Sequence, residues 1–121
     1  MSLLSTALAG LVALLHVYFL VLEMFLWATP FGAKTFGRRI EEQRATKVLA
    51  ANQGLYNGFL AAGLIWSMLV SDADLSFSLR AFFLSCVIIA GVYGGATAST
   101  KIIFVQAVPA VLAFGALWLA K

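Results

Sequence analysis

Apolar and polar residues fall in long blocks along this chain, with four apolar segments separated by short polar connections. The segments cover residues 3–29, 48–70, 80–99 and 102–120. A bilayer-spanning helix needs about 20 mainly apolar residues, so each segment meets this length or nearly does. The pattern predicts an all-α polytopic membrane protein, with residues 1–121 forming one integral membrane domain built as an antiparallel bundle of four transmembrane helices.

The composition supports a membrane environment. Of the 121 residues, 63% are hydrophobic and 11% are charged, whereas about 25% of residues are charged in ordinary soluble domains. The first ten residues, MSLLSTALAG, contain no Lys or Arg, and the apolar run continues beyond residue 22. A signal peptide has a basic start and a shorter apolar core, so the first segment is predicted to remain as a transmembrane helix.

The basic residues predict an orientation. Five of the eight lie around the first connection, namely Lys34, Arg38, Arg39, Arg44 and Lys47. Lys101 lies in the third connection, while Arg80 and Lys121 belong to the opposite side. Cytoplasmic loops accumulate Lys and Arg, so the loop at residues 31–47 is predicted to be cytoplasmic and both termini outside. The net charge of +3 therefore indicates topology and does not predict nucleic-acid binding.

The cytoplasmic loop is predicted to be partly helical. Its start, TPFGAKTFG, contains a proline that cannot continue the first helix. Good helix formers follow, and they predict a second helix that begins near residue 39. Arg38 with Glu42, and Gln43 with Lys47, have the i,i+4 spacing of a solvated helical face; contact with anionic lipids is the alternative.

The second connection reads SDADLSFS and predicts a short polar turn. Ser71 or Asp74 is expected to cap the helix that follows, because Ser and Asp side chains accept hydrogen bonds from free N–H groups at helix starts.

Two ionisable residues lie inside the first apolar segment, in the stretch HVYFLVLE. His16 and Glu23 are seven residues apart, so they share one helical face at about 10 Å axial separation. An acidic side chain at the centre of a span costs about 2.5–3.5 kcal/mol, and Glu23 is therefore expected to face protein or a water-filled cavity. An intramembrane Glu near a His predicts a functional site.

A denser polar group lies in the second segment, in the motif NQGLYNG. Its polar residues are spaced i, i+1, i+4 and i+5, which predicts one patch at the depth of Glu23. Tyr93 and Gln106, from the third and fourth segments, are expected at the same level. The predicted ligand-binding or ion-coupling site comprises Glu23, His16, Asn52, Gln53, Tyr56, Asn57, Tyr93 and Gln106.

Helix adhesion is the alternative interpretation of these polar residues, since side-chain hydrogen bonds between transmembrane helices contribute roughly 0.6–2 kcal/mol each. Glu23 fits adhesion less well, because a neutral amide would have a lower desolvation cost. Small residues also repeat every fourth position at Ala50, Gly54, Gly58 and Ala62. This stripe predicts close packing within the bundle, with a homo-oligomer as the alternative.

The sequence predicts no metal site and names no cofactor. The single cysteine, Cys86, has no intrachain partner for a disulfide. One His and one Glu two turns apart on a straight helix cannot jointly ligate one ion. Neither a nucleophile elbow nor a phosphate-binding glycine loop is present.

Four segments together resemble a known family: HVYFLVLE at residues 16–23, NQGLYNG, VYGG at 92–95 and QAVPA at 106–110. The chain is similar to the short bacterial integral membrane proteins catalogued as domain of unknown function 1304. The resemblance covers nearly the whole chain, and NQGLYNG is its most specific part. It implies a four-helix protein of the bacterial inner membrane, and it implies no catalytic residues.

Three functions remain open on the sequence. The first is binding or transport of a small or amphipathic molecule, proton-coupled through Glu23. The second is a membrane-embedded enzyme acting on a lipid, quinone or sterol-like substrate, with Glu23 or His16 as acid or base and Tyr56 or Tyr93 as donor. The third is an accessory membrane subunit. Hydrogen-bonding groups outnumber reactive ones, which favours the first, with the bilayer and a small-molecule or lipid ligand as partners.

Overall fold

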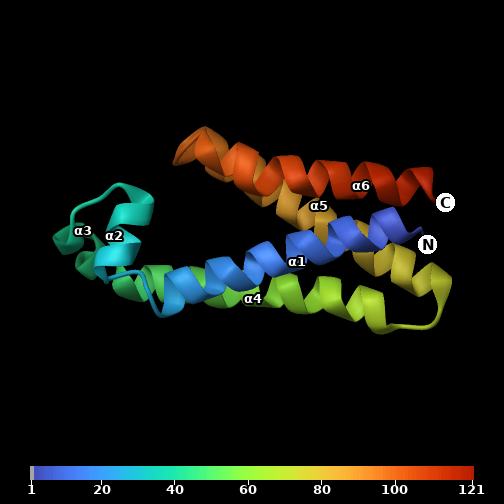
Figure 1. The fold of residues 1–121 in the computed structure, drawn as a ribbon, viewed down its shortest axis with the longest axis horizontal. Helices are drawn as coiled ribbons and strands as arrows, with labels where there is room; N and C mark the ends of the chain where they lie inside the picture. The colour runs from blue at the N-terminus through green and yellow to red at the C-terminus, as the bar shows by residue number, and fades with distance from the viewer. Residues whose placement is uncertain (1) are drawn as a thin grey trace. The chain divides into compact units, whose positions relative to one another are not determined.

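Helices account for nearly all of the chain. The computed structural model describes residues 2–121, and Met1 of the predicted domain lies outside the described residues. The elements are α1 (Leu3–Met24), α2 (Pro30–Phe36), α3 (Ile40–Ala45), α4 (Lys47–Leu69), α5 (Ala73–Thr97), the π-helix η1 (Ile103–Ala107) and α6 (Val108–Leu119) (Figure 1). Residues 2–121 contain no strand, so the predicted all-α class is confirmed.

Two helices, α1 and α5, are long and apolar enough to cross a membrane, and the apolar helix Ile103–Leu119 is shorter. The 23-residue α4 is not among them, and its apolar sequence is interrupted by the polar motif NQGLYNG. The structure thus supports membrane character through two helices, while the four-span bundle stays a prediction.

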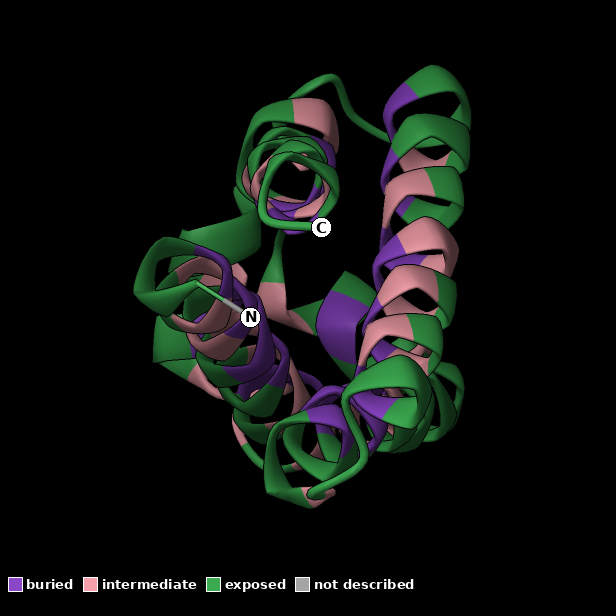
Figure 2. Cartoon of the chain, turned by 90° about the vertical axis from the view of Figure 1, so that its right-hand side faces the viewer, coloured by how far each residue is buried: buried purple, intermediate pink, exposed green. Residues whose placement is uncertain are grey.

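The chain divides into two compact units. Unit 1 contains residues 2–14 and 60–121, and unit 2 is Leu15–Phe59. In both units, buried positions follow one side of each long helix and exposed positions follow the other (Figure 2). This is the arrangement expected when only one stripe of a helix packs against its neighbours.

The core of unit 1 is apolar and closely packed. Its members are Val12, Ala13, Leu64, Leu84, Val87, Ala110, Ala113 and Leu117. Helix α5 packs against η1 and α6. The two backbones approach closely at Gly91, where an added Cβ would lie 2.7 Å from the backbone nitrogen of Ala107. The π-helix η1 ends two residues before Pro109, a residue that has no N–H to donate to the preceding turn.

The first helix ends five residues earlier than predicted, at Met24 rather than 29. The reason is that Thr29 starts a new helix. Its hydroxyl oxygen accepts a hydrogen bond from the Gly32 N–H at 3.2 Å, and Pro30 occupies the first position of α2, where its missing N–H costs nothing. The predicted loop at 31–47 is therefore largely helical.

Two further boundaries differ from prediction. The helix expected from residue 39 is interrupted at Thr46, which separates α3 from α4. Helix α5 begins at Ala73, seven residues before the predicted segment, and its cap is Asp72 rather than Ser71 or Asp74. The Asp72 carboxylate accepts hydrogen bonds from the N–H groups of Asp74 and Leu75 at 2.9 and 3.2 Å. Arg80 consequently lies inside a helix.

Candidate binding site at Glu23

The carboxyl group of Glu23 is the centre of the candidate site in unit 2. Glu23 lies in the penultimate position of α1 and is 8% exposed. The side-chain amide of Asn57 in α4 donates a hydrogen bond to its Oε1 atom at 2.5 Å. A residue of the apolar first segment and one of the motif NQGLYNG therefore meet. The sequence predicts that the motif lies at the depth of Glu23, but it does not single out Asn57.

Close packing of α1 and α4 brings the two side chains together. A Cβ added to Gly54 would lie 2.8 Å from Cγ of Met24 and 3.0 Å from Cβ of Glu23. At Gly58, an added Cβ would lie 2.6 Å from Cδ1 of Leu20. Larger residues at these positions would separate the helices, so the small-residue stripe does permit close packing. Its first member, Ala50, is buried, while its last, Ala62, is exposed.

His16 is fully buried, at 1% exposed, and lies two helical turns before Glu23 on α1. Its imidazole packs edge-to-face against the ring of Phe19, with 5.1 Å between centroids. Edge-to-face packing of this kind is favourable between aromatic rings.

The other polar residues of NQGLYNG do not share the environment of Asn57. Asn52, Gln53 and Tyr56 are exposed, and the Tyr56 ring lies 6.0 Å from that of Phe59. With 3.6 residues per turn, Asn52 and Asn57 point about 140° apart around the helix axis. The predicted patch is thus too wide to face one partner, and only its Asn57 edge reaches Glu23.

Tyr93 and Gln106 belong to unit 1. Tyr93 is exposed on α5, and Gln106 is half-buried in η1. The expectation that these two residues lie at the level of Glu23 stays a prediction.

A second polar cluster in unit 2 was not foreseen. Gln43, predicted on a solvated face, is fully buried, and its Nε2 donates to the backbone oxygen of Trp27 at 3.0 Å. The Trp27 indole N–H donates to the hydroxyl of Thr46, also at 3.0 Å, and the Arg38 guanidinium lies 5.9 Å from the Trp27 ring centroid. One signal in the sequence could have indicated this burial. Ile40 and Gln43 are spaced i,i+3, so α3 has one side without charged residues.

The charged residues of α3 are exposed, as predicted. The one ion pair found within residues 2–121 joins Arg39 and Glu42 at 3.1 Å, in place of the expected Arg38 and Glu42 pair. Exposed pairs of this kind contribute about 0–1 kcal/mol, so the cluster around Trp27 fixes α2 and α3 more firmly than the surface charges do.

The Glu23 and Asn57 pair can recognise hydrogen-bond donors. A carboxylate has about four acceptor sites, and the Asn57 amide uses one. The remaining acceptor capacity lies in an apolar environment, where hydrogen bonds and charge interactions are stronger than in water. Within residues 2–121 no group of three or more His, Cys, Asp or Glu residues is placed to hold a metal ion.

These features define a class: a small all-α protein with two helices capable of crossing a membrane and a buried carboxyl–amide pair. The chain belongs to the family described as "Protein of unknown function (DUF1304)", which matches residues 10–118. It is 34% identical over 115 residues to the uncharacterised protein YpaA of Lactococcus lactis subsp. lactis, covering 93% of this chain and 95% of that protein. No solved structure matches it.

Proposed function

We propose that this protein is a four-span protein of the bacterial inner membrane that binds, and by binding transports, a small or amphipathic molecule at Glu23. The observation that carries the proposal is the buried Glu23 carboxyl held by the Asn57 amide. Adhesion between α1 and α4 is already provided by close packing at Gly54. A carboxyl group at that contact adds a desolvation cost, and a ligand-binding role accounts for its presence.

The chemistry of the pair indicates the class of molecule. The Asn57 amide donates to one carboxyl oxygen, so the remaining oxygen sites suit a ligand that carries a hydrogen-bond donor or a positive charge. The apolar residues of α1 suit an apolar body on the same molecule. For proton coupling, we propose that a proton and a cationic ligand bind the Glu23 carboxyl group in exchange for one another.

Native mass spectrometry of the gently solubilised full chain tests this proposal. The wild type is compared with Glu23→Gln and with the control Glu41→Gln, which removes an exposed carboxylate of α3. We expect wild type and Glu41→Gln to release the same small molecule and Glu23→Gln to lose it. Retention of that molecule in Glu23→Gln, or its absence from the wild type, would refute the proposal.

Reconstitution separates transport from binding alone. The molecule identified by mass spectrometry is loaded into proteoliposomes with a pH gradient, and its flux is measured for wild type and Glu23→Gln. Gradient-dependent flux that is lost in the variant supports coupled transport, whereas conversion to a product without a gradient would identify an enzyme instead.

A further inference from the structure

Arg80 is the most deeply buried charged residue of unit 1. It lies on α5, two helical turns after the helix begins, and it is only 2% exposed. Arginine is almost never fully buried in proteins unless it is paired. Its guanidinium group keeps its positive charge in proteins, so a partner for that charge is to be expected.

The protein partners of Arg80 are neutral. Its Nη1 donates hydrogen bonds to the hydroxyl oxygens of Ser5 and Thr6, at 3.1 and 3.2 Å. Its Nε is buried and has no hydrogen-bond partner among the described residues. Within residues 2–121, no carboxylate lies at salt-bridge distance from the guanidinium. The charge is therefore oriented by hydroxyl groups but not neutralised by them.

The Nε–H of Arg80, which has no partner among the described residues, is a donor suited to an oxyanion. The Nε–H is part of the guanidinium edge that binds carboxylates and phosphates through two parallel hydrogen bonds. The Ser5 and Thr6 hydroxyls accept from Nη1, and each also carries one O–H donor. Nearby buried hydroxyls are already committed, since Ser76 donates to the backbone oxygen of Ser67 and Ser67 donates to that of Leu64.

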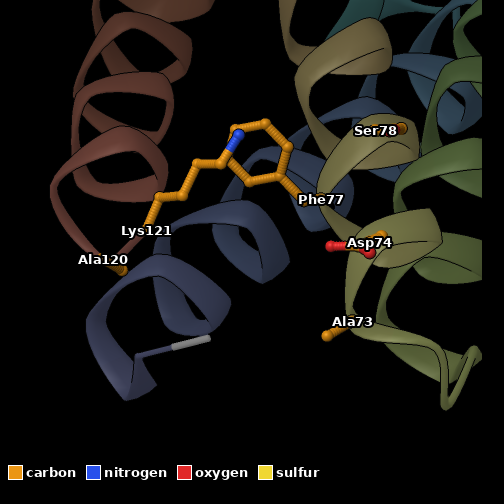
Figure 3. A pocket seen from close by; sticks show the side chains of 6 residues that line it. All are labelled: Ala73, Asp74, Phe77, Ser78, Ala120 and Lys121. Carbon is orange, nitrogen blue, oxygen red and sulfur yellow. The ribbon is translucent and has the colours of Figure 1, made fainter.

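A pocket of about 410 Å³ reaches the helical turn that precedes Arg80. It lies between the start of α5 and the end of α6 and is lined by Ala73, Asp74, Phe77, Ser78, Ala120 and Lys121 (Figure 3). The Lys121 ammonium lies 4.3 Å from the Phe77 ring centroid. The Asp74 carboxylate lines the same pocket and repels an anion. The pocket itself therefore does not suit an anion, and Arg80 is the group with the charge to bind one.

The depth of the site matches that of lipid headgroups. Ser5 and Thr6 lie in the first turn of α1, which begins at Leu3. With a rise of 1.5 Å per residue, both hydroxyls lie within about 5 Å of the helix end. In a membrane span that begins there, this is the region that lipid phosphates occupy, and soluble anions also reach it.

We propose that Arg80, Ser5 and Thr6 form a binding site for a phosphate group, supplied either by an anionic lipid or by free phosphate. The site is separate from Glu23 and does not depend on the function proposed for that residue. The guanidinium supplies the charge and the two-point contact, and the hydroxyls hold the guanidinium in position.

The test uses the full chain in maltoside micelles, a detergent without phosphate. Dioctanoyl phosphatidylglycerol, inorganic phosphate and dioctanoylglycerol are titrated separately, and binding is measured by native mass spectrometry and by the thermal unfolding midpoint. The variants are Arg80→Lys, which keeps the charge but loses the two-point contact, and Thr6→Val, which keeps the shape but loses the hydroxyl. Lys101→Gln, which removes an exposed cation of unit 1, is the control.

We expect phosphatidylglycerol to bind the wild type and Lys101→Gln equally, and to bind Arg80→Lys about tenfold more weakly, the effect of losing one charge-assisted hydrogen bond. Thr6→Val should weaken binding severalfold. If Arg80→Lys does not fold, the result for Thr6→Val decides whether the proposed site binds phosphate. If inorganic phosphate also binds, the phosphate ion alone is sufficient for binding. If only phosphatidylglycerol binds, the site recognises the phosphate of a lipid headgroup. The proposal is wrong if neither probe binds, if dioctanoylglycerol binds equally well, or if folded variants match the wild type.

Discussion

At the scale of single residues, the sequence predicts the burial of one polar side chain of unit 2, Glu23, but not that of another, Gln43. Glu23 lies in a long apolar run, and the cost of exposing a carboxyl group to lipid predicts its burial. Gln43 lies among charged residues, and its burial against Trp27 depends on the position of α3. Asn57 could be named as one of four candidates, but its selection as the partner of Glu23 depends on the rotation of α4.

The indole of Trp27 leads to a prediction at this scale. Its N–H donates to the Thr46 hydroxyl, and Trp27 is mostly buried. Thr46→Val keeps the side-chain shape but removes the acceptor, so the free energy of unfolding should fall by about 1–3 kcal/mol, the cost of an unsatisfied buried donor. Denaturant unfolding in detergent, followed by Trp fluorescence, measures the change.

Thr35→Val is the matched control for this prediction. The Thr35 hydroxyl is exposed and donates to the backbone oxygen of Phe31 in the same helix, so its removal should change stability by less than about 0.5 kcal/mol, as for other surface positions. Equal effects of the two substitutions would show that the contact between Trp27 and Thr46 does not stabilise unit 2.

At the scale of elements, the sequence predicts helices better than their interruptions. The sequence predicts a loop at residues 31–47 with one helix beginning near residue 39, but this region contains the two short helices α2 and α3. Thr29 and Pro30 start α2, and Gly37 ends it with a left-handed backbone at φ 64°, a conformation that glycine adopts without strain. Each signal is present in the sequence, but a proline after an apolar run reads equally well as the end of one helix or the start of the next.

Close approach of α1 and α4 gives the prediction at this scale. Gly54→Ala would place a methyl group 3.0 Å from Cβ of Glu23 and 2.8 Å from Cγ of Met24, and overpacking of this kind costs about 1–3 kcal/mol. The substitution should lower the unfolding free energy and weaken the hydrogen bond between Asn57 and Glu23. Two measurements test this prediction: the free energy of unfolding, and the binding of the molecule that the wild type releases in mass spectrometry.

Gly115→Ala provides the comparison, because an added Cβ there meets no atom within 4 Å. Alanine favours a helix over glycine by about 1 kcal/mol, so this variant should be as stable as the wild type or more so. If Gly54→Ala behaves like Gly115→Ala, the close approach of α1 and α4 does not depend on the small size of residue 54.

At the scale of the whole molecule, the arrangement in the membrane is the remaining prediction. Helices α1 and α5 can cross a membrane by length and composition, while the basic residues predict both termini outside. Single cysteines introduced into a Cys86→Ser background at Thr35, Ser71 and Ser99, all exposed positions, test the topology with a membrane-impermeant thiol reagent. We expect Ser71→Cys to react in intact cells, and Thr35→Cys and Ser99→Cys to react only after permeabilisation. Labelling of all three from one side would rule out the four-span arrangement.

The sequence by itself determined the helical class, the long apolar segments, the family and the burial of Glu23. The class, the segments and the burial depend on composition and on local periodicity, and the family depends on the similarity of its motifs; all of these are properties of the chain before it folds. Only the tertiary structure decided which polar groups meet: Asn57 at Glu23, Gln43 at Trp27, and Ser5 and Thr6 at Arg80. Helix rotation and close approach determine these contacts, and they result from packing between segments distant in sequence.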